Sequence, residues 1–417
     1  MKQKKKMSLT IKVLLGLFLG VGFGILSNIV LEPQLNKEIV RWVLDPLGNV
    51  FLRGIKMIVV PLVLCSLICG TASVGDIKKL GRVGIKTLLY YTFTTAIAIT
   101  IAMVVTKVIS PGVGGQSLIA GATEFKSSKA PFIMDVFVNM VPTNPIESLV
   151  KGEMLQIIVF AIIFGISITL IGKKAKPLLD VVEQINEVLL KIIGIVMLFA
   201  PVGVFALISK VIMLQGVDVL TKLIKYALTI ILVLAIQAVV VYGLALKFLG
   251  KVNPVKFYKK FWPVMVLGFS TSSSNASIPM NMETCEKKLG TSQSITSFTI
   301  PLGATMNMDG TAIMQGVATI FISQVYGIPL TFTQLLMVVL TATLASVGTA
   351  GVPGVGLITL SMVLQQVGLP VEGISLVLGV DRILDMIRTA VNITGDASAT
   401  VIMSKSENEL DLDVYNS

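Results

Sequence analysis

The stretch LDMIRTAVNITGDAS, residues 384–398, places charged and amide side chains inside an apolar run that extends from Gly373 to Met403. A charge at the centre of a membrane helix costs about 2.5–3.5 kcal/mol, so five uncompensated charges would cost roughly 12–17 kcal/mol. Such a sequence must give its charges partners away from lipid. The ionisable residues of this run are Asp381, Arg382, Asp385, Arg388 and Asp396.

On an α-helix most of these side chains share one face. At 100° per residue, four of the ionisable groups (Arg382 excepted) fall with Thr389 and Asn392 within about 100° of one another. The opposite side is apolar and is expected to face lipid: Leu384, Ile387, Ala390, Val391 and Ile393. The pattern leaves open a functional site and a structural salt-bridge seam, and ionisable residues at membrane depth favour the functional site.

The stretch NMDGT, residues 307–311, adds further oxygen ligands. Asn307, Asp309 and Thr311 supply amide, carboxylate and hydroxyl oxygens, and Gly310 weakens the helix beside them. An unwound turn would also expose backbone carbonyls. Together these groups suit a hard cation, which prefers oxygen ligands.

The charges of the two stretches do not cancel, because four carboxylates (Asp309 with those of the first run) oppose two arginines. The excess favours bound cations, whereas the planar fork of Arg388 binds a carboxylate at two points. Asp385, one helical turn earlier, could hold an ammonium group. These features predict an acidic amino acid that enters with cations, although Asp385 and Arg388 could instead pair with each other at i, i+3.

The composition of the whole chain indicates that these elements belong to a polytopic membrane protein. Of the 417 residues, 54% are hydrophobic and only 14% are charged, against about 25% charged in soluble domains. The absence of histidine excludes Ser-His catalysis and imidazole metal ligands, and three cysteines form no disulfide framework. We expect no enzyme and no nucleic-acid partner, because the net charge of +11 fits basic loops on the cytoplasmic side.

The apolar run at residues 9–31 is expected to be an uncleaved first helix with its basic N-terminus inside. Two later apolar segments are interrupted, by GFSTSSSNASIP (268–279) and by SVGTAGVPGVG (346–356). They could be loops between short spans or re-entrant hairpins. Hairpins are favoured, because they keep the basic ETCEKKLG stretch (283–290) and the C-terminal tail inside.

Each interrupted segment is followed by a polar helix, which predicts an inverted repeat with a binding site near the membrane midplane. The motifs resemble the signature regions of the glutamate transporter family, the dicarboxylate/amino acid:cation symporters. They are the serine triplet of the first interruption, PLGATMNMDGT (301–311), SVGTAGVPG (346–354) and LDMIRTAVNITGD (384–396). The resemblance runs from LGRVGIKTLLYYTFTTA (80–96) to the end of the chain.

The resemblance implies an all-α membrane protein with eight transmembrane helices and two re-entrant hairpins, assembled as a homotrimer in the cell membrane. Both termini are expected in the cytoplasm. Scaffold helices one and two would occupy residues 1–83, and trimerising helices four and five residues 131–216. A transport domain would comprise residues 84–130 and 217–417 and move as an elevator, with the second hairpin as extracellular gate.

The implied function is symport of glutamate or aspartate with sodium ions, protons being the alternative coupling ion, without a cofactor. Arg388 would hold the side-chain carboxylate of the substrate, and Asp385 with Thr389 the amino group. Asn392 and the serine tip would hold the main-chain carboxylate. The full set of implied substrate residues is Ser273, Ser274, Thr311, Gly356, Asp385, Arg388, Thr389 and Asn392.

Three sodium sites are implied by the same resemblance. The first uses Asp396, Asn392, Asn307 and carbonyls near Gly303. The second uses Asp309, Asn307, Tyr91, Thr94 and Thr95. The third uses carbonyls around Thr305, Ser346, Val347 and Thr349. Without the resemblance, the hydroxyls of YYTFTTAIA (90–98) would be interpreted as helix packing.

One departure and two rivals accompany this interpretation. Many family members carry an arginine where this chain has Thr271 or Met386, and Arg382, one turn before Met386, could supply that charge. A C4-dicarboxylate symporter is the nearest rival, although its substrates lack the ammonium that Asp385 would hold. An intramembrane aspartyl protease needs two carboxylates that share a proton, and Arg388 would keep a neighbouring carboxylate ionised.

Overall fold

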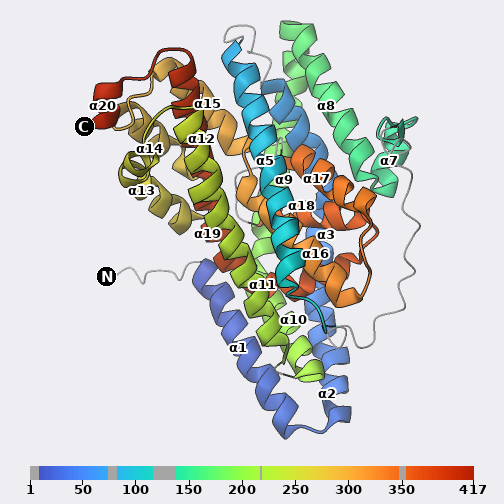
Figure 1. Ribbon diagram of the computed structural model, residues 1–417. Coiled ribbons are helices and arrows are strands. Elements are labelled where there is room, and N and C mark those ends of the chain that lie inside the picture. The colour runs from blue at the N-terminus through green and yellow to red at the C-terminus, as the bar shows by residue number, and fades with distance from the viewer. Residues whose placement is uncertain (1–8, 74–81, 116–137, 217, 347–353) are drawn as a thin grey trace, which may run out of the picture.

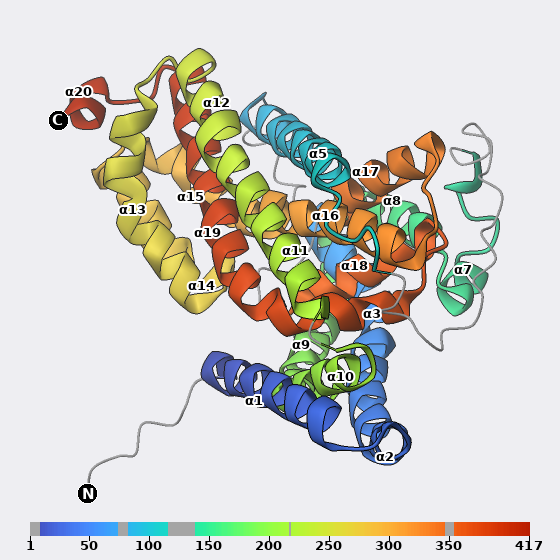
Figure 2. The same ribbon diagram turned by 60° about the horizontal axis from the view of Figure 1, so that its bottom comes forward.

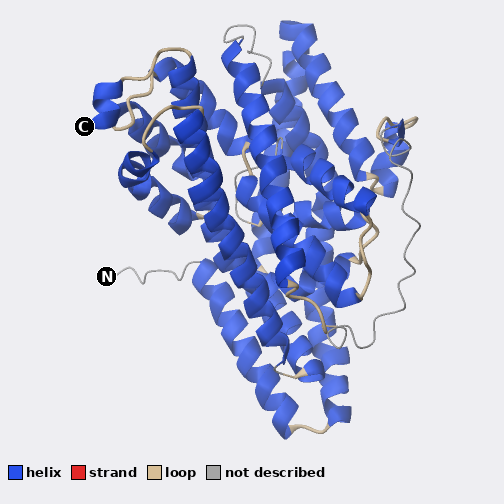
Figure 3. Cartoon of the chain, viewed as in Figure 1, coloured by secondary structure: helices blue, strands red, loops and turns tan. Residues whose placement is uncertain are grey.

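The computed structural model describes residues 9–73, 82–115, 138–216, 218–346 and 354–417, and these residues form helices without a strand (Figures 1 and 3). The predicted all-α fold is therefore confirmed for the described ranges. Within these ranges, four stretches are long and apolar enough to cross a membrane: Ile11–Val30, Arg82–Ile109, Gln156–Leu198 and Leu220–Phe248.

One group of helices comes from the first half of the chain. It comprises α1 (Leu9–Val30), α2 (Pro33–Ile39), a π-helical turn (Val40–Leu44), α3 (Asp45–Ser73), α7 (Pro145–Lys151), α8 (Met154–Ile171), α9 (Lys176–Leu198) and α10 (Ala200–Gln215). Helix α1 packs along α10, and α3 packs against α8, α9 and α10. Gly16, Gly20 and Gly24 recur every four residues on α1, where added side chains would collide with α10.

The second group surrounds the long helix α19 (Ile374–Ser406), as Figure 2 shows. Its other members are α5 (Arg82–Ile109), α11 (Asp218–Ala235), a π-helical segment (Ile236–Val241), α12 (Tyr242–Phe248), α13 (Pro254–Thr271), α14 (Ser274–Lys287), α15 (Gln293–Met306), α16 (Asp309–Tyr326), α17 (Phe332–Ser346), α18 (Val355–Gln366) and α20 (Leu412–Asn416). Helices α11, α13, α15 and α16 all contact α19 directly.

Both interrupted segments form pairs of helices that pack side by side, α13 with α14 and α17 with α18 (Figure 1). The first turn passes through Ser272, whose φ of 51° lies in the left-handed region, and Ser273 then caps α14. The second turn, residues 347–353, lies outside the described residues. Two helices packed in this way fit re-entrant hairpins, which stay a prediction.

The helix break beside NMDGT falls at Asn307–Met308, between α15 and α16, and not at Gly310. Gly310 instead lies in the first turn of α16, where an added Cβ would sit 2.6 Å from the carbonyl oxygen of Arg388. Its missing side chain therefore lets α16 approach α19 closely. This approach brings the two polar stretches of the sequence together.

The expectation that one side of α19 faces lipid is wrong. Leu384, Ala390, Val391 and Ile393 are buried, with at most 9% of their surface exposed, and Ile387 is partly buried against the core. The hairpin of α13 and α14 packs on α19 and covers much of its apolar side. The helical wheel placed the polar stripe correctly but could not show that other helices of the same chain cover the apolar side.

Candidate substrate and cation sites

Arg388 is fully buried and binds two carboxylates of its own helix. Its Nη1 donates to Asp381 Oδ1 at 2.8 Å and its Nη2 to Asp385 Oδ1 at 2.9 Å, whereas its Nε has no hydrogen-bond partner among the described residues. Arg382 lies 3.4 Å from the other oxygen of Asp385. These four residues form the arginine cluster, and their formal charges sum to zero.

Two neighbouring helices bound the space beside the Arg388 guanidinium. A Cβ added to Gly356 on α18 would lie 3.3 Å from Arg388 Nη2 and 3.4 Å from Thr311 Cγ2 on α16. On α19 itself, the Thr389 hydroxyl donates to the Asp385 carbonyl at 2.8 Å. Helices α16, α18 and α19 thus meet around one buried cation, as the predicted substrate site requires.

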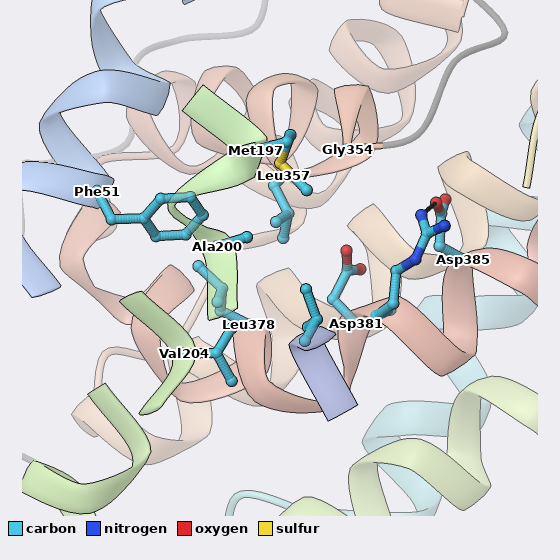
Figure 4. Close-up of a pocket in the computed structure, with 11 residues that line it drawn as sticks. Phe51, Met197, Ala200, Val204, Gly354, Leu357, Leu378, Asp381 and Asp385 are labelled. Atoms are coloured by element: carbon cyan, nitrogen blue, oxygen red, sulfur yellow. Dashed lines mark hydrogen bonds and ion pairs between the residues drawn. The ribbon is translucent and has the colours of Figure 1, made fainter. Parts of the chain in front are cut away.

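A small cavity reaches the arginine cluster from the side of α1, α3 and α10. Asp381, Arg382 and Asp385 contribute to its wall, while the helices opposite contribute apolar side chains (Figure 4). Its other lining residues are Val13, Phe51, Met197, Ala200, Val204, Gly354, Leu357 and Leu378. The cavity therefore joins an ionic surface to an apolar one, between the two groups of helices.

Asp309 is a buried carboxylate with neutral partners. It accepts hydrogen bonds from Thr95 Oγ1 at 2.6 Å, Gln237 Nε2 at 2.7 Å and Tyr242 Oη at 2.8 Å. Its exposed fraction is 0%, and no lysine or arginine of the described ranges pairs with it. These hydrogen bonds stabilise the ionised form without cancelling its charge, so an ionised Asp309 calls for a cation beside it.

Asp396 has fewer partners still. Asn307 Nδ2 donates to its Oδ1 at 2.9 Å, while Asp396 Oδ2 and Asn307 Oδ1 are buried and have no hydrogen-bond partner in the part of the chain that the structure describes. Buried acceptors normally have a donor, and two orphaned oxygens at one place suit a hard cation. We call Asp309 and Asp396 the acid pair. These are the two carboxylates that the arginines leave unbalanced in the charge count from the sequence.

The backbone and α5 complete the surroundings of Asp396. A Cβ added at Gly303 would lie 2.5 Å from Asp396 Oδ1 and 2.6 Å from the Tyr91 hydroxyl oxygen. Asn307 Nδ2 also donates to the Asn392 carbonyl at 2.9 Å. The structure thus brings together all residues predicted for the first sodium site. The chemistry of these groups suits a sodium ion, because two of their oxygens have no hydrogen-bond donor among the described residues.

The second predicted site is assembled in part. Thr95 donates to Asp309. The neighbouring Thr94 is also buried, and its hydroxyl lies 3.2 Å from the Tyr91 carbonyl oxygen. The Tyr91 hydroxyl donates to the Thr299 carbonyl at 3.1 Å. Both carboxylate oxygens of Asp309 already have donors, so Asp309 differs from Asp396 in having no orphaned oxygen.

A sequence model of the sodium:dicarboxylate symporter family matches residues 9–406. The chain belongs to this family. It is 38% identical over 412 residues to the proton/sodium-glutamate symport protein of Geobacillus stearothermophilus, covering 97% of this chain and 96% of the relative. The proton/glutamate-aspartate symporter of Escherichia coli K12 is 38% identical, with 97% and 94% covered. The C4-dicarboxylate transport protein of Bacillus subtilis 168 is 33% identical, also with 97% and 94% covered.

The symporter's third predicted sodium site is described only in part. The Thr305 hydroxyl donates to the Leu302 carbonyl at 2.9 Å, and the Ser346 hydroxyl to the Thr343 carbonyl at 2.7 Å. Val347 and Thr349 lie outside the described residues. This site therefore stays a prediction.

The serine tip of the symporter forms the start of α14. Ser273 Oγ accepts a hydrogen bond from the Ala276 amide at 3.3 Å, and Ser274 is buried. Farther along α14, Asn281 Nδ2 contacts the Ile393 carbonyl at 3.4 Å and ties the hairpin to α19. The role of the two serines in holding a carboxylate stays a prediction.

Sequence reasoning missed two residues of the acid pair's surroundings, Gln237 and Tyr242. Both lie in the apolar stretch 222–249, on the π-helical segment and the first turn of α12. An amide inside such a stretch is itself a signal, because polar groups at membrane depth need a partner. Asn392 was predicted, but its side chain holds a backbone group, since its Oδ1 accepts from the Gly310 amide at 2.7 Å.

Proposed function

We propose that this symporter takes up glutamate or aspartate together with sodium ions, with protons as an additional or alternative coupling ion. The observation that carries this proposal is the separation of charge. A neutral arginine cluster with a buried guanidinium lies on α19, whereas the acid pair, divided between α16 and α19, has no lysine or arginine partner among the described residues. An anionic substrate suits the first site and cations suit the second.

The substrate would bind with its side-chain carboxylate on Arg388 and its ammonium on Asp385. Bidentate pairing suits the guanidinium fork, and the unpartnered Nε offers a donor for it. Thr311 and Gly356 border this position. The names of the Geobacillus and Escherichia relatives, which mention glutamate and aspartate, support the same class of substrate.

The acid pair would bind the co-transported cations. Asp396, Asn307 and the carbonyls near Gly303 and Asn392 would hold one sodium ion, and Asp309 with the α5 hydroxyls a second. Each sodium ion would offset the charge of one buried carboxylate. The acid pair would then carry no net charge while the substrate is bound.

Transport would follow an elevator movement of a homotrimer with eight transmembrane helices, two re-entrant hairpins and cytoplasmic termini. Residues 1–83 and 131–216 would form the scaffold, and residues 84–130 and 217–417 the moving domain. The packing of α1 on α10 and of α3 on α8 and α9, distinct from the helices around α19, supports this division. The cavity at the arginine cluster lies between the two groups.

A C4-dicarboxylate is the second candidate substrate, because the Bacillus relative is named a C4-dicarboxylate transport protein. Succinate has no ammonium group for Asp385, which favours an amino acid. Uptake of labelled aspartate into proteoliposomes, with and without an inward sodium gradient, tests the main proposal. Sodium-driven uptake that excess glutamate blocks and excess succinate leaves intact is expected. Uptake of succinate but not of aspartate would refute it.

A further inference from the structure

In the proposed binding mode the substrate takes Arg388, the cation that Asp381 pairs with in the arginine cluster. Asp381 Oδ1 receives the Nη1 hydrogen bond of Arg388 at 2.8 Å, in an environment where only 9% of the Asp381 side chain is exposed. Asp385 has a second cation beside it, since Arg382 lies at 3.4 Å. The two acids of the cluster therefore depend on Arg388 to different degrees.

Substrate binding changes the charge of this cluster. Its four residues are neutral together, whereas an acidic amino acid brings two carboxylates and one ammonium, a net charge of −1. The ammonium offsets Asp385, and the side-chain carboxylate takes up the Arg388 guanidinium. A carboxylate that binds this guanidinium at two points must use Nη1 or Nη2. Both nitrogens already donate to an aspartate, so the substrate must displace one of these hydrogen bonds.

The charged and titratable neighbours of Asp381 offer little replacement. On its own helix these are Arg382, Asp385 and Arg388, and on α11 the phenol of Tyr226 lies within electrostatic reach. The helices across the cavity contribute only apolar groups to its lining, among them Val13 and Phe51 (Figure 4). A buried carboxylate that loses its guanidinium to a competitor is stabilised by binding a proton.

We propose that Asp381 is the proton site of this symporter, taking up one proton when the substrate carboxylate engages Arg388 and releasing it when the substrate leaves. The proton comes from the water that delivers the substrate and binds a carboxylate oxygen of Asp381. On release, Arg388 Nη1 pairs with Asp381 again and the proton departs to the opposite side. The inference rests on the proposed function, because it needs an acidic substrate on Arg388.

Calorimetric titration of the purified protein with aspartate at saturating sodium, in buffers of different ionisation heat, tests this site. Wild-type protein should take up about one proton per aspartate bound, and its affinity should fall about tenfold per pH unit over the range in which Asp381 is ionised in the free protein and protonated in the complex. Asp381→Asn should bind aspartate with no proton uptake and no such pH dependence. Asp45→Asn, which removes an acid paired to Lys210 on the other helix group, is the matched control and should behave as wild type.

The outcomes separate the two proposals. Sodium-dependent aspartate binding without proton uptake in wild type, or with unchanged proton uptake in Asp381→Asn, refutes the proton site and leaves the proposed function intact. No aspartate binding by the wild type refutes both. Should Asp381→Asn not assemble, Asp381→Glu decides: retained uptake with a shifted pH midpoint supports the site, and an unshifted midpoint refutes it.

Discussion

The arginine cluster on α19 and the acid pair, Asp309 on α16 with Asp396 on α19, solve the problem of buried charge in opposite ways. In the cluster, arginines offset two aspartates within hydrogen-bond distance. In the acid pair, the partners are hydroxyls and amides, and two acceptor oxygens have none. A buried ion pair is complete without a ligand, whereas a buried acid with neutral donors still needs a cation.

The comparison assigns a different ligand to each region. The cluster can accept an anion only by exchanging partners on Arg388, so it discriminates by charge and geometry. The acid pair can accept a cation by addition. Coupling then follows from position, because the Asn392 side chain holds the Gly310 amide beside Arg388, while its carbonyl contacts Asn307 beside Asp396. One residue thus contacts both regions.

The largest effect is expected from breaking the cluster with Arg388→Cys. Removing one partner of a buried charged pair costs roughly 3–5 kcal/mol, or about 100- to 5,000-fold in affinity. Aspartate binding, measured by calorimetry on the correctly assembled variant, should fall by this amount, while serine or cysteine becomes a ligand. Arg382→Cys is the matched control, with a smaller loss, because Arg382 lies farther from Asp385 than Arg388 does. Aspartate affinity within a few-fold of wild type would contradict the assignment.

A smaller effect, on sodium rather than on substrate specificity, is expected from Asp396→Asn. The variant keeps one side-chain oxygen but loses the negative charge of Asp396. We infer that a cation offsets this charge, because two acceptor oxygens at the site have no donor among the described residues. The sodium concentration for half-maximal aspartate binding should rise at least about tenfold. Asp309→Asn should raise it as well. If both variants keep the wild-type sodium dependence, protons are the coupling ion and the acid pair has another role.

Tyr242→Phe sharpens the comparison within the acid pair. It removes one of the two donors to Asp309 Oδ2, while Gln237 remains as the other. Leaving a buried charged acceptor short of a donor costs about 1–3 kcal/mol, so sodium affinity or thermal stability should fall measurably. Tyr226→Phe, equally buried but hydrogen-bonded to no described residue of the acid pair, is the control. Equal losses in both variants would show that the phenol of Tyr242 acts only by packing.

The sequence predicted the cluster better than the acid pair, for a physical reason. Asp381, Asp385 and Arg388 lie on one helix at spacings of three to four residues, so helical periodicity alone places them together. Asp309 receives donors from α5, the π-helical segment and α12, and no periodicity relates separate elements. The resemblance supplied the α5 hydroxyls but not Gln237 or Tyr242. The covering of α19 by a hairpin was also outside the reach of a helical wheel.

The smallest effect is expected at a counterpart of the arginine cluster just beyond the end of α19, where the two cations, unlike Arg388, reach solvent. Glu407 pairs with Lys86 at 2.6 Å and with Arg82 at 2.8 Å, and 76% of the Arg82 side chain is exposed. The hydrogen bond from Lys86 holds the pKa of Glu407 below its usual value. Its stabilising contribution is therefore full above the ordinary glutamate pKa and is lost as the pH falls through the lower folded value.

Glu407→Gln should destabilise the protein by only about 0.2–1 kcal/mol, since water and salt screen exposed ion pairs. Thermal unfolding at low and at high salt measures this, and added salt should remove the difference between variant and wild type. Aspartate affinity should not change. Arg388→Cys followed by the same thermal unfolding tests the role of burial, because both substitutions remove one member of a carboxylate–cation triad and the Arg388 side chain is only 1% exposed. A loss at Glu407 as large as that at Arg388 would show that ion pairing itself, and not its burial, determines the energetics of the cluster.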